Sequence, residues 1–175
     1  MYNTREDMEF GRFFEQDKLY PSSIQTAQIN AGSQTGQEWI FTEVQTLAED
    51  GTRAFLIQPR NKTSENHLFI SMTSSDNCTL EIYEKPTFSA NGTELSPVNT
   101  NRIYKYNAKA KLRLYHTPTI TDNGTLLYKE LGTVLDSKRL ALNSNYFYYI
   151  KITSSANDNE LSILLDWFEK KIRRI

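Results

Sequence analysis

Apolar and polar positions alternate along much of the chain after residue 37, and this pattern predicts β-strands. Between Tyr104 and Leu114, six apolar side chains at even positions alternate with five polar side chains at odd positions. A period of two places the two sets on opposite faces of a strand, which a helix could not do. Compact apolar or alternating runs follow one another at short spacing. They predict strands over 38–47, 53–58, 67–72, 78–83, 104–114, 126–131, 146–153 and 161–168.

This series of short strands is typical of an antiparallel β-sandwich or barrel, so we expect an all-β domain over residues 38–175. Asp50-Gly51 marks a turn after the first strand. The polar run 157–160 is more typical of a hairpin tip than of a calcium loop. Cys78 falls on the apolar side of the strand 78–83, and we therefore expect it to be a small core residue.

Residues 1–37 differ from the rest of the chain. An aromatic and charged stretch is followed by a break at Pro21, and then by a polar run rich in Gln, Ser and Thr. Such a segment buries too little surface by itself to offset the entropy lost on ordering. We expect an extended N-terminal arm that is disordered or is ordered by a neighbour. Its candidate contact residues are Phe10, Phe13, Phe14 and Tyr20.

Charge is distributed unevenly between these two parts. Residues 1–50 carry nine acidic and three basic side chains, whereas residues 51–175 carry twelve acidic and seventeen basic ones. The excess of acid near the N-terminus either belongs to a docking arm or reflects an uneven surface. The net charge of −1 argues against a dedicated nucleic-acid-binding protein.

One face of the alternating run 104–114 is basic. It carries Lys105, Lys109, Lys111 and Arg113 at alternate positions. These side chains either meet an acidic partner, which includes the acidic arm of another copy, or form a solvated face that prevents edge-to-edge aggregation.

A segment of fourteen residues occurs twice, at 82–95 and at 114–127, with seven identical positions. Both copies contain Pro-Thr followed by Asn-Gly-Thr. Proline ends a strand by removing a backbone donor, and Asn-Gly suits a tight type I′ turn. We expect two equivalent loops at one end of the domain, which serve either as a binding surface or only as turns. The candidate residues of these loops are Phe88, Asn91, Gly92, His116, Asn123 and Gly124.

The sequence contains no motif for catalysis or for a cofactor. One Cys and two His residues give no zinc-binding spacing and no disulfide within the chain. Glycine-rich phosphate loops and G-x-S-x-G are absent. Thr, Asn and Ser make up 46 of 175 residues, which favours strands and turns. We therefore expect a protein that is not an enzyme, with no cofactor, no transmembrane helix and no secretory signal, whose four Asn-x-Thr sequons are turn and strand residues.

The stretch 80–167 resembles a group of tailed-bacteriophage virion proteins. The shared pattern is a Pro-Thr-x-x-x-Asn-Gly-Thr loop, an Asn-Arg pair at Asn101 and Arg102, a Tyr-His-Thr-Pro-Thr run at 115–119 and a second Asn-Gly-Thr loop. Asn143 with Tyr146, and the closing run 166–169, also match. Asp166 stands where Glu is expected, and the Lys-rich stretch after Arg102 departs from the Ser/Thr-rich stretch of those proteins.

The resemblance implies a structural virion protein, an auxiliary or decoration subunit on the capsid exterior with a jelly-roll-like sandwich. It implies a homotrimer that binds the major capsid protein, is made in the host cytoplasm and resides at the virion surface, without nucleic-acid or membrane partners. Residues 1–37 lie outside the resemblance, and their composition suggests a capsid-contacting arm. Two alternatives remain open. One is a receptor- or carbohydrate-binding module of a tail fibre, with Phe88, Asn91 and Asn123 as sugar contacts, and the other is a head–tail connector component.

Overall fold

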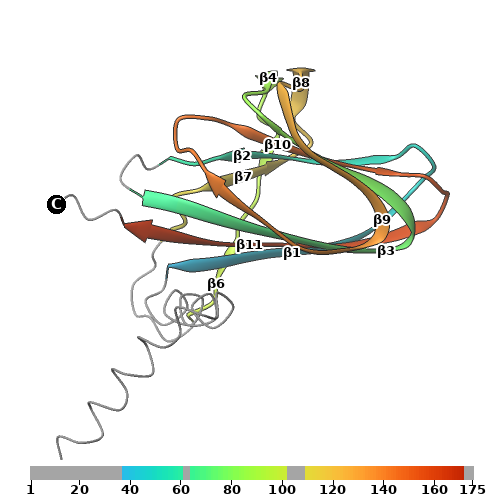
Figure 1. The fold of residues 1–175 in the computed structure, drawn as a ribbon, viewed down its shortest axis with the longest axis horizontal. Helices are drawn as coiled ribbons and strands as arrows, with labels where there is room; N and C mark the ends of the chain where they lie inside the picture. Colours follow the sequence, from blue (N-terminus) through green and yellow to red (C-terminus); the bar gives the residue numbers. More distant parts are fainter. Residues whose placement is uncertain (1–36, 61–63, 102–108, 172–175) are drawn as a thin grey trace, which may run out of the picture.

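The computed structural model describes residues 37–60, 64–101 and 109–171, which form an all-β, antiparallel, jelly-roll-like sandwich (Figure 1). No helix long and apolar enough to cross a membrane occurs in these residues. The strands are β1 (Glu38–Leu47), β2 (Thr52–Gln58), β3 (Ser64–Glu84), β4 (Thr87–Ala90), β5 (Thr93–Glu94), β6 (Val98–Asn99), β7 (Arg113–His116), β8 (Thr119–Asp122), β9 (Thr125–Leu142), β10 (Tyr148–Ser154) and β11 (Asn159–Lys171).

Two long strands, β3 and β9, bend through both layers of the sandwich. The first part of β3, residues 64–74, pairs with β11, and its last part, residues 78–84, pairs with β10. β9 follows the other edge of β3 over most of its length. One layer therefore contains β5, β7, β2 and β10, and the other contains β6, β1 and β11, with parts of β3 and β9 completing both.

The bend in β3 is held by the buried side chain of Asn159. The register of β3 against β9 shifts between Thr73 and Cys78. At that point Asn159 Oδ1 accepts hydrogen bonds from the Asp76 N–H at 2.9 Å and from Ser75 Oγ at 3.1 Å. Because these bonds support the chain through the bend, the two strands predicted at 67–72 and 78–83 are one continuous strand.

Two further predictions near this bend need correction. The run 157–160 is not a hairpin tip, because β10 and β11 each pair with β3 and lie in different layers. The turn between them connects the layers. The strand predicted at 126–131 extends to Leu142, because β9 follows β3 through the bend. The first predicted strand, by contrast, matches β1 at both ends.

The core lies between the two layers and follows the predicted alternation. Cys78, Leu80 and Ile82 are fully buried on one face of β3. Cys78 is a core residue, as predicted, and its sulfur accepts a hydrogen bond from Asn159 Nδ2 at 3.3 Å. Trp167 of β11 is the largest of the fully buried side chains. Alternating apolar positions therefore identify which side chains fill the sandwich.

The strand predicted over 104–114 is wrong over residues 109–112 and right at Arg113 and Leu114. Residues 109–112 are not in a strand, and β7 begins only at Arg113. The cause is a buried carboxylate, since the backbone N–H groups of Lys111 and Leu112 donate to Glu169 Oε1 at 2.7 and 2.8 Å. These donors are used by a side chain and not by a neighbouring strand. Residues 102–108 lie outside the described residues.

Candidate functional site

The two copies of the repeat pair with each other around a pseudo-two-fold axis. β4 and β8, one from each copy, form a separate two-stranded sheet in which Phe88 faces Ile120, the same position of the repeat. The strand that enters each loop pairs with the strand that leaves the other loop, namely Glu84 with Thr125 and His116 with Thr93. The two predicted loops therefore lie together, and Figure 1 shows β4 and β8 outside the sandwich, beyond the layer that contains β2 and β10.

The loops have the same backbone conformation in both copies. The residues before proline, Lys85 and Thr117, have φ values of 56° and 51°. Gly92 and Gly124 have φ values of 88° and 83°. A Cβ at Gly92 would lie 2.0 Å from the His116 carbonyl oxygen, and one at Gly124 would lie 2.3 Å from the Glu84 carbonyl oxygen. Glycine is therefore required at both positions.

The predicted type I′ turn is wrong. A type I′ turn needs positive φ at both central residues, but Asn91 and Asn123 are not among the residues with positive φ. In addition, β4 and β5, which flank the first loop, belong to different sheets. Each Asn-Gly pair therefore moves the chain from the β4–β8 sheet back to the main sheet.

Several loop side chains are engaged inside this unit. The Phe88 ring stands edge-on to Phe147 with their centroids 4.9 Å apart. Burial raises the pKa of the Tyr83 phenol, and a hydrogen bond with the Asn123 side chain opposes this rise. His116 Nδ1 lies 3.2 Å from a guanidinium nitrogen of Arg53.

Asn101 lies apart from these loops. Its N–H donates to the Asn99 side chain at 2.8 Å, just after β6. β6 itself pairs with the start of β1 in the other layer of the sandwich. The structure therefore brings the Asn-Gly loops together and places Asn101 elsewhere.

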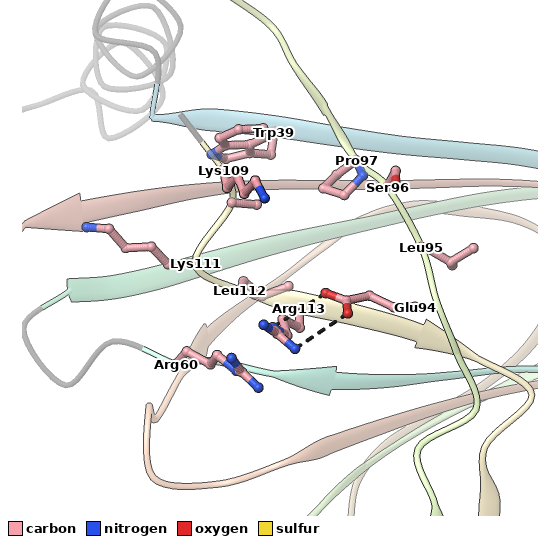
Figure 2. Close-up of a pocket in the computed structure, with 11 residues that line it drawn as sticks. Trp39, Arg60, Glu94, Leu95, Ser96, Pro97, Lys109, Lys111, Leu112 and Arg113 are labelled. Carbon is pink, nitrogen blue, oxygen red and sulfur yellow. Dashed lines mark hydrogen bonds and ion pairs between the residues drawn. The ribbon is translucent and has the colours of Figure 1, made fainter. Parts of the chain in front are cut away.

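An open pocket of about 740 Å³ lies where the chain crosses from β5 to β6 between the two layers (Figure 2). Four cationic side chains and one carboxylate line it, which makes the pocket electropositive. Trp39 of β1 and Leu112 add apolar surface. The lining residues are Trp39, Arg60, Glu94, Leu95, Ser96, Pro97, Lys109, Ala110, Lys111, Leu112 and Arg113.

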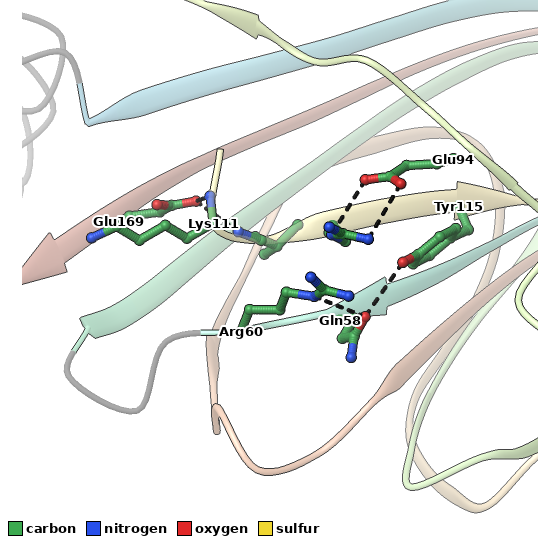
Figure 3. Close-up of polar contacts among 8 residues, drawn as sticks. Gln58, Arg60, Glu94, Lys111, Tyr115 and Glu169 are labelled. Atoms are coloured by element: carbon green, nitrogen blue, oxygen red, sulfur yellow. Dashed lines mark hydrogen bonds and ion pairs between the residues drawn. The ribbon is translucent and has the colours of Figure 1, made fainter. Parts of the chain in front are cut away.

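Glu169 of β11 positions the lysine-bearing side of the pocket (Figure 3). Its side chain accepts the two backbone hydrogen bonds from Lys111 and Leu112 described above, and Trp167 Nε1 lies 3.4 Å from the same oxygen. Burial raises the pKa of Glu169, while these hydrogen bonds and the nearby Lys111 charge oppose the rise. The segment is thereby fixed to the core, whereas Lys109 and Lys111 themselves remain exposed.

The opposite side of the pocket holds a weak ion pair. Arg113 Nε lies 3.4 Å from Glu94 Oε1. Gln58 Oε1 lies 3.4 Å from both Arg60 Nε and the Tyr115 hydroxyl (Figure 3). Within the described ranges, no ion pair is formed by Arg60, Lys109 or Lys111. The pocket therefore presents more positive charge than its own carboxylate balances.

Three residues of the predicted basic face lie at this pocket. Lys109, Lys111 and Arg113 belong to the predicted basic face and line the pocket together. Trp39 and Arg60 were not predicted, because only the fold brings β1 and the end of β2 to the same edge. The remaining candidates, Lys105, Arg102, Phe10, Phe13, Phe14 and Tyr20, lie outside the described residues.

The role of Glu169 was also missed, although the sequence contains a signal for it. Glu169 stands two residues after Trp167 and therefore shares the core-facing side of the last strand. A carboxylate on a core-facing side needs buried hydrogen-bond donors, which the lysine segment supplies.

Comparison with known proteins shows no family for this chain and gives a distant structural neighbour. No protein-family model matches the chain, and no curated protein sequence matches it. Among solved structures, the crystal structure of the Yersinia pseudotuberculosis-derived mitogen is similar with a TM-score of 0.35 and 11% sequence identity, over 78% of this chain and 87% of that chain. A likeness at this level carries no information about function.

Proposed function

We propose that this protein is a structural, non-catalytic virion subunit that decorates the exterior of a bacteriophage capsid through protein–protein contacts, as a trimer. The resemblance of residues 80–167 to virion proteins supports a place in a bacteriophage particle. The observation that carries the proposal is the basic pocket, because it offers a built contact surface. Three of its four cations, Arg60, Lys109 and Lys111, form no ion pair with another described residue. The partner surface is an acidic segment of the major capsid protein.

The arrangement of charge favours an extended acidic partner. Figure 2 shows Lys109 and Lys111 on one side of the pocket and Arg60 with Arg113 on the other. A peptide with several carboxylates can contact both groups at once. Long-range attraction of this kind steers association and weakens as salt screens it.

Co-sedimentation of the full chain with empty capsids tests the proposal. We expect binding at low ionic strength, weaker binding at high salt, and a roughly tenfold loss of affinity in Lys109→Glu, since a like charge then faces the acidic partner. Lys85→Glu is the matched control, because it makes the same charge change in the β4–β8 unit and should bind normally. Absence of capsid binding by the native chain, or equal binding by both variants, would contradict the proposal.

The carbohydrate-binding alternative receives no specific support from the loop geometry. The Phe88 ring packs edge-on to Phe147, and the Asn123 side chain is hydrogen-bonded to Tyr83, so both groups already have partners inside the protein. No feature of the described residues specifically favours a head–tail connector.

A further inference from the structure

β9 is a long edge strand with exposed apolar side chains. It contains 18 residues, whereas strands are usually about 5–6 residues long. Only β3 pairs with it in the part of the chain that the structure describes. Four of the seven large apolar side chains exposed in that part lie on β9, with 43–64% exposure: Leu126, Leu127, Leu131 and Val134. A free edge with such side chains is a surface for pairing with another strand.

The positions of these side chains favour a partner that adds at the edge. Leu131 stands opposite Thr79 on the outer face of the layer, as Lys129 stands opposite Glu81. Leu127 is the extra residue of a bulge between Leu126 and Tyr128, so it has no partner on β3. A partner that rested on one face of β9 would leave part of this surface in water. An added strand brings side chains to both faces and also satisfies the backbone groups of the edge.

We propose that a second copy of this chain covers the edge, with the two β9 strands antiparallel around a two-fold axis at Leu131. This register sets Leu131 opposite Leu131 of the second copy and Lys129 opposite Thr133. A register centred on Lys129 or on Glu130 would set like charges opposite one another, which destabilises a strand pair. The β9 sequence is thus self-complementary around Leu131, as an isologous contact requires.

This contact is separate from capsid binding. Pairing through β9 produces a dimer, or a hexamer if each copy also belongs to the proposed trimer. The basic pocket lies at the opposite edge of the sandwich, between β7 and β1, so both surfaces can be occupied at once.

Sedimentation velocity of the full chain tests the contact. We expect the native chain to sediment as a species with an even number of copies, and Leu131→Lys to halve its mass, because two ammonium groups would then meet at the axis. Val44→Lys is the matched control, since Val44 is 74% exposed but lies on β1, and its mass should not change. Circular dichroism verifies that each variant is folded.

Disulfide trapping gives an independent readout if Leu131→Lys fails to fold. The only native cysteine, Cys78, is buried, so a new surface thiol can be followed alone. Under mild oxidation, Leu131→Cys should form a covalent dimer and Val44→Cys should not. A native monomer, a trimer unaffected by Leu131→Lys, or equal crosslinking of the two cysteine variants would overturn the inference. Dependence on Leu131 without any capsid binding would leave the inference standing and remove the proposed function.

Discussion

The two copies of the repeat fold alike, yet they lead into different structures. In each copy the chain leaves a main-sheet strand at a positive-φ residue, passes proline, forms one strand of the β4–β8 sheet and returns at a positive-φ glycine. After Gly92 the chain forms only the two-residue β5 and then crosses between the layers. After Gly124 it forms β9, which contains 18 residues.

The residues that follow each loop account for this difference. Leu95-Ser96-Pro97 follows β5, and proline cannot supply the donor that a longer ladder needs. Leu126-Leu127-Tyr128 follows Gly124 and contains no such break, so pairing with β3 continues. The repeat therefore specifies a turn, and the residues after it decide what the turn leads into.

Alanine substitutions at Gly92 and Gly124 should separate the role of the turn from the role of the residues that follow it. We expect them to have the largest effects on the free energy of unfolding. Gly124→Ala should lower the free energy of unfolding by about 3 kcal/mol, because the Cβ meets the Glu84 carbonyl where β9 joins β3. Gly92→Ala should cost about 1–2 kcal/mol, since the short β5 can shift away at smaller loss. Urea unfolding followed by circular dichroism measures both values.

Gly132→Ala is the control for this pair. Gly132 lies on the same strand, has no positive φ, and an added Cβ would meet its nearest neighbour at 3.7 Å. We expect less than about 0.5 kcal/mol of change, as for an ordinary surface substitution. Equal losses at Gly92 and Gly124 would mean that the strain of the turn, and not the strand that follows it, determines the cost.

Much of the sandwich could be predicted because local pattern and tertiary structure agree there. β1 has the expected bounds, and the alternation around Leu80 identifies core-facing side chains. The shared sequence predicts that the two loops are alike and lie near each other, but it does not predict how they pair. The symmetric contact of Phe88 with Ile120 depends on how the surrounding strands are ordered, which the repeat does not encode.

The predictions fail where one buried polar side chain replaces regular pairing. Asn159 supports the chain where β3 bends, so one strand appears as two in the sequence pattern. Glu169 takes two backbone donors from the lysine segment, so residues 109–112 of a strongly alternating run are not in a strand. Both residues are distant in sequence from the segments they hold. Period-two alternation therefore indicates which side chains face the core, but it does not show which partner the backbone bonds.

The residues just before each copy extend the comparison to charge. Glu81 and Arg113 occupy equivalent positions relative to the two copies. Each forms an ion pair with a side chain of a neighbouring strand, but the charge at this position is negative before the first copy and positive before the second. Lys129 Nζ lies 2.9 Å from Glu81 Oε1, and the Glu81 side chain is largely buried. The hydrogen bond from Lys129 lowers the pKa of Glu81 below its ordinary value of 4.5, although burial opposes this shift.

Glu81→Gln should therefore have a moderate, pH-dependent effect. A lowered pKa favours the ionised form in the folded state, so the stabilisation is present above the ordinary pKa and is lost as the pH falls through the folded value. We expect a loss of about 0.5 kcal/mol at neutral pH that disappears in acid. Urea unfolding of the native chain and of Glu81→Gln at neutral pH and at acidic pH measures this difference. The same loss at both would attribute the effect to packing and not to charge.

The ion pair formed by Arg113 in the other copy should contribute least to stability. Arg113 and Glu94 are separated by 3.4 Å and their side chains are 37% and 51% exposed, so solvent screens their attraction. Glu94→Gln should leave urea unfolding unchanged. The same substitution removes the only carboxylate among the residues that line the basic pocket, so capsid co-sedimentation should strengthen at low salt and lose the gain at high salt. A destabilised Glu94→Gln protein would show that the two ion pairs are similar in energy despite their different exposure. Unchanged capsid binding would show that Glu94 does not limit the charge that the pocket offers a partner.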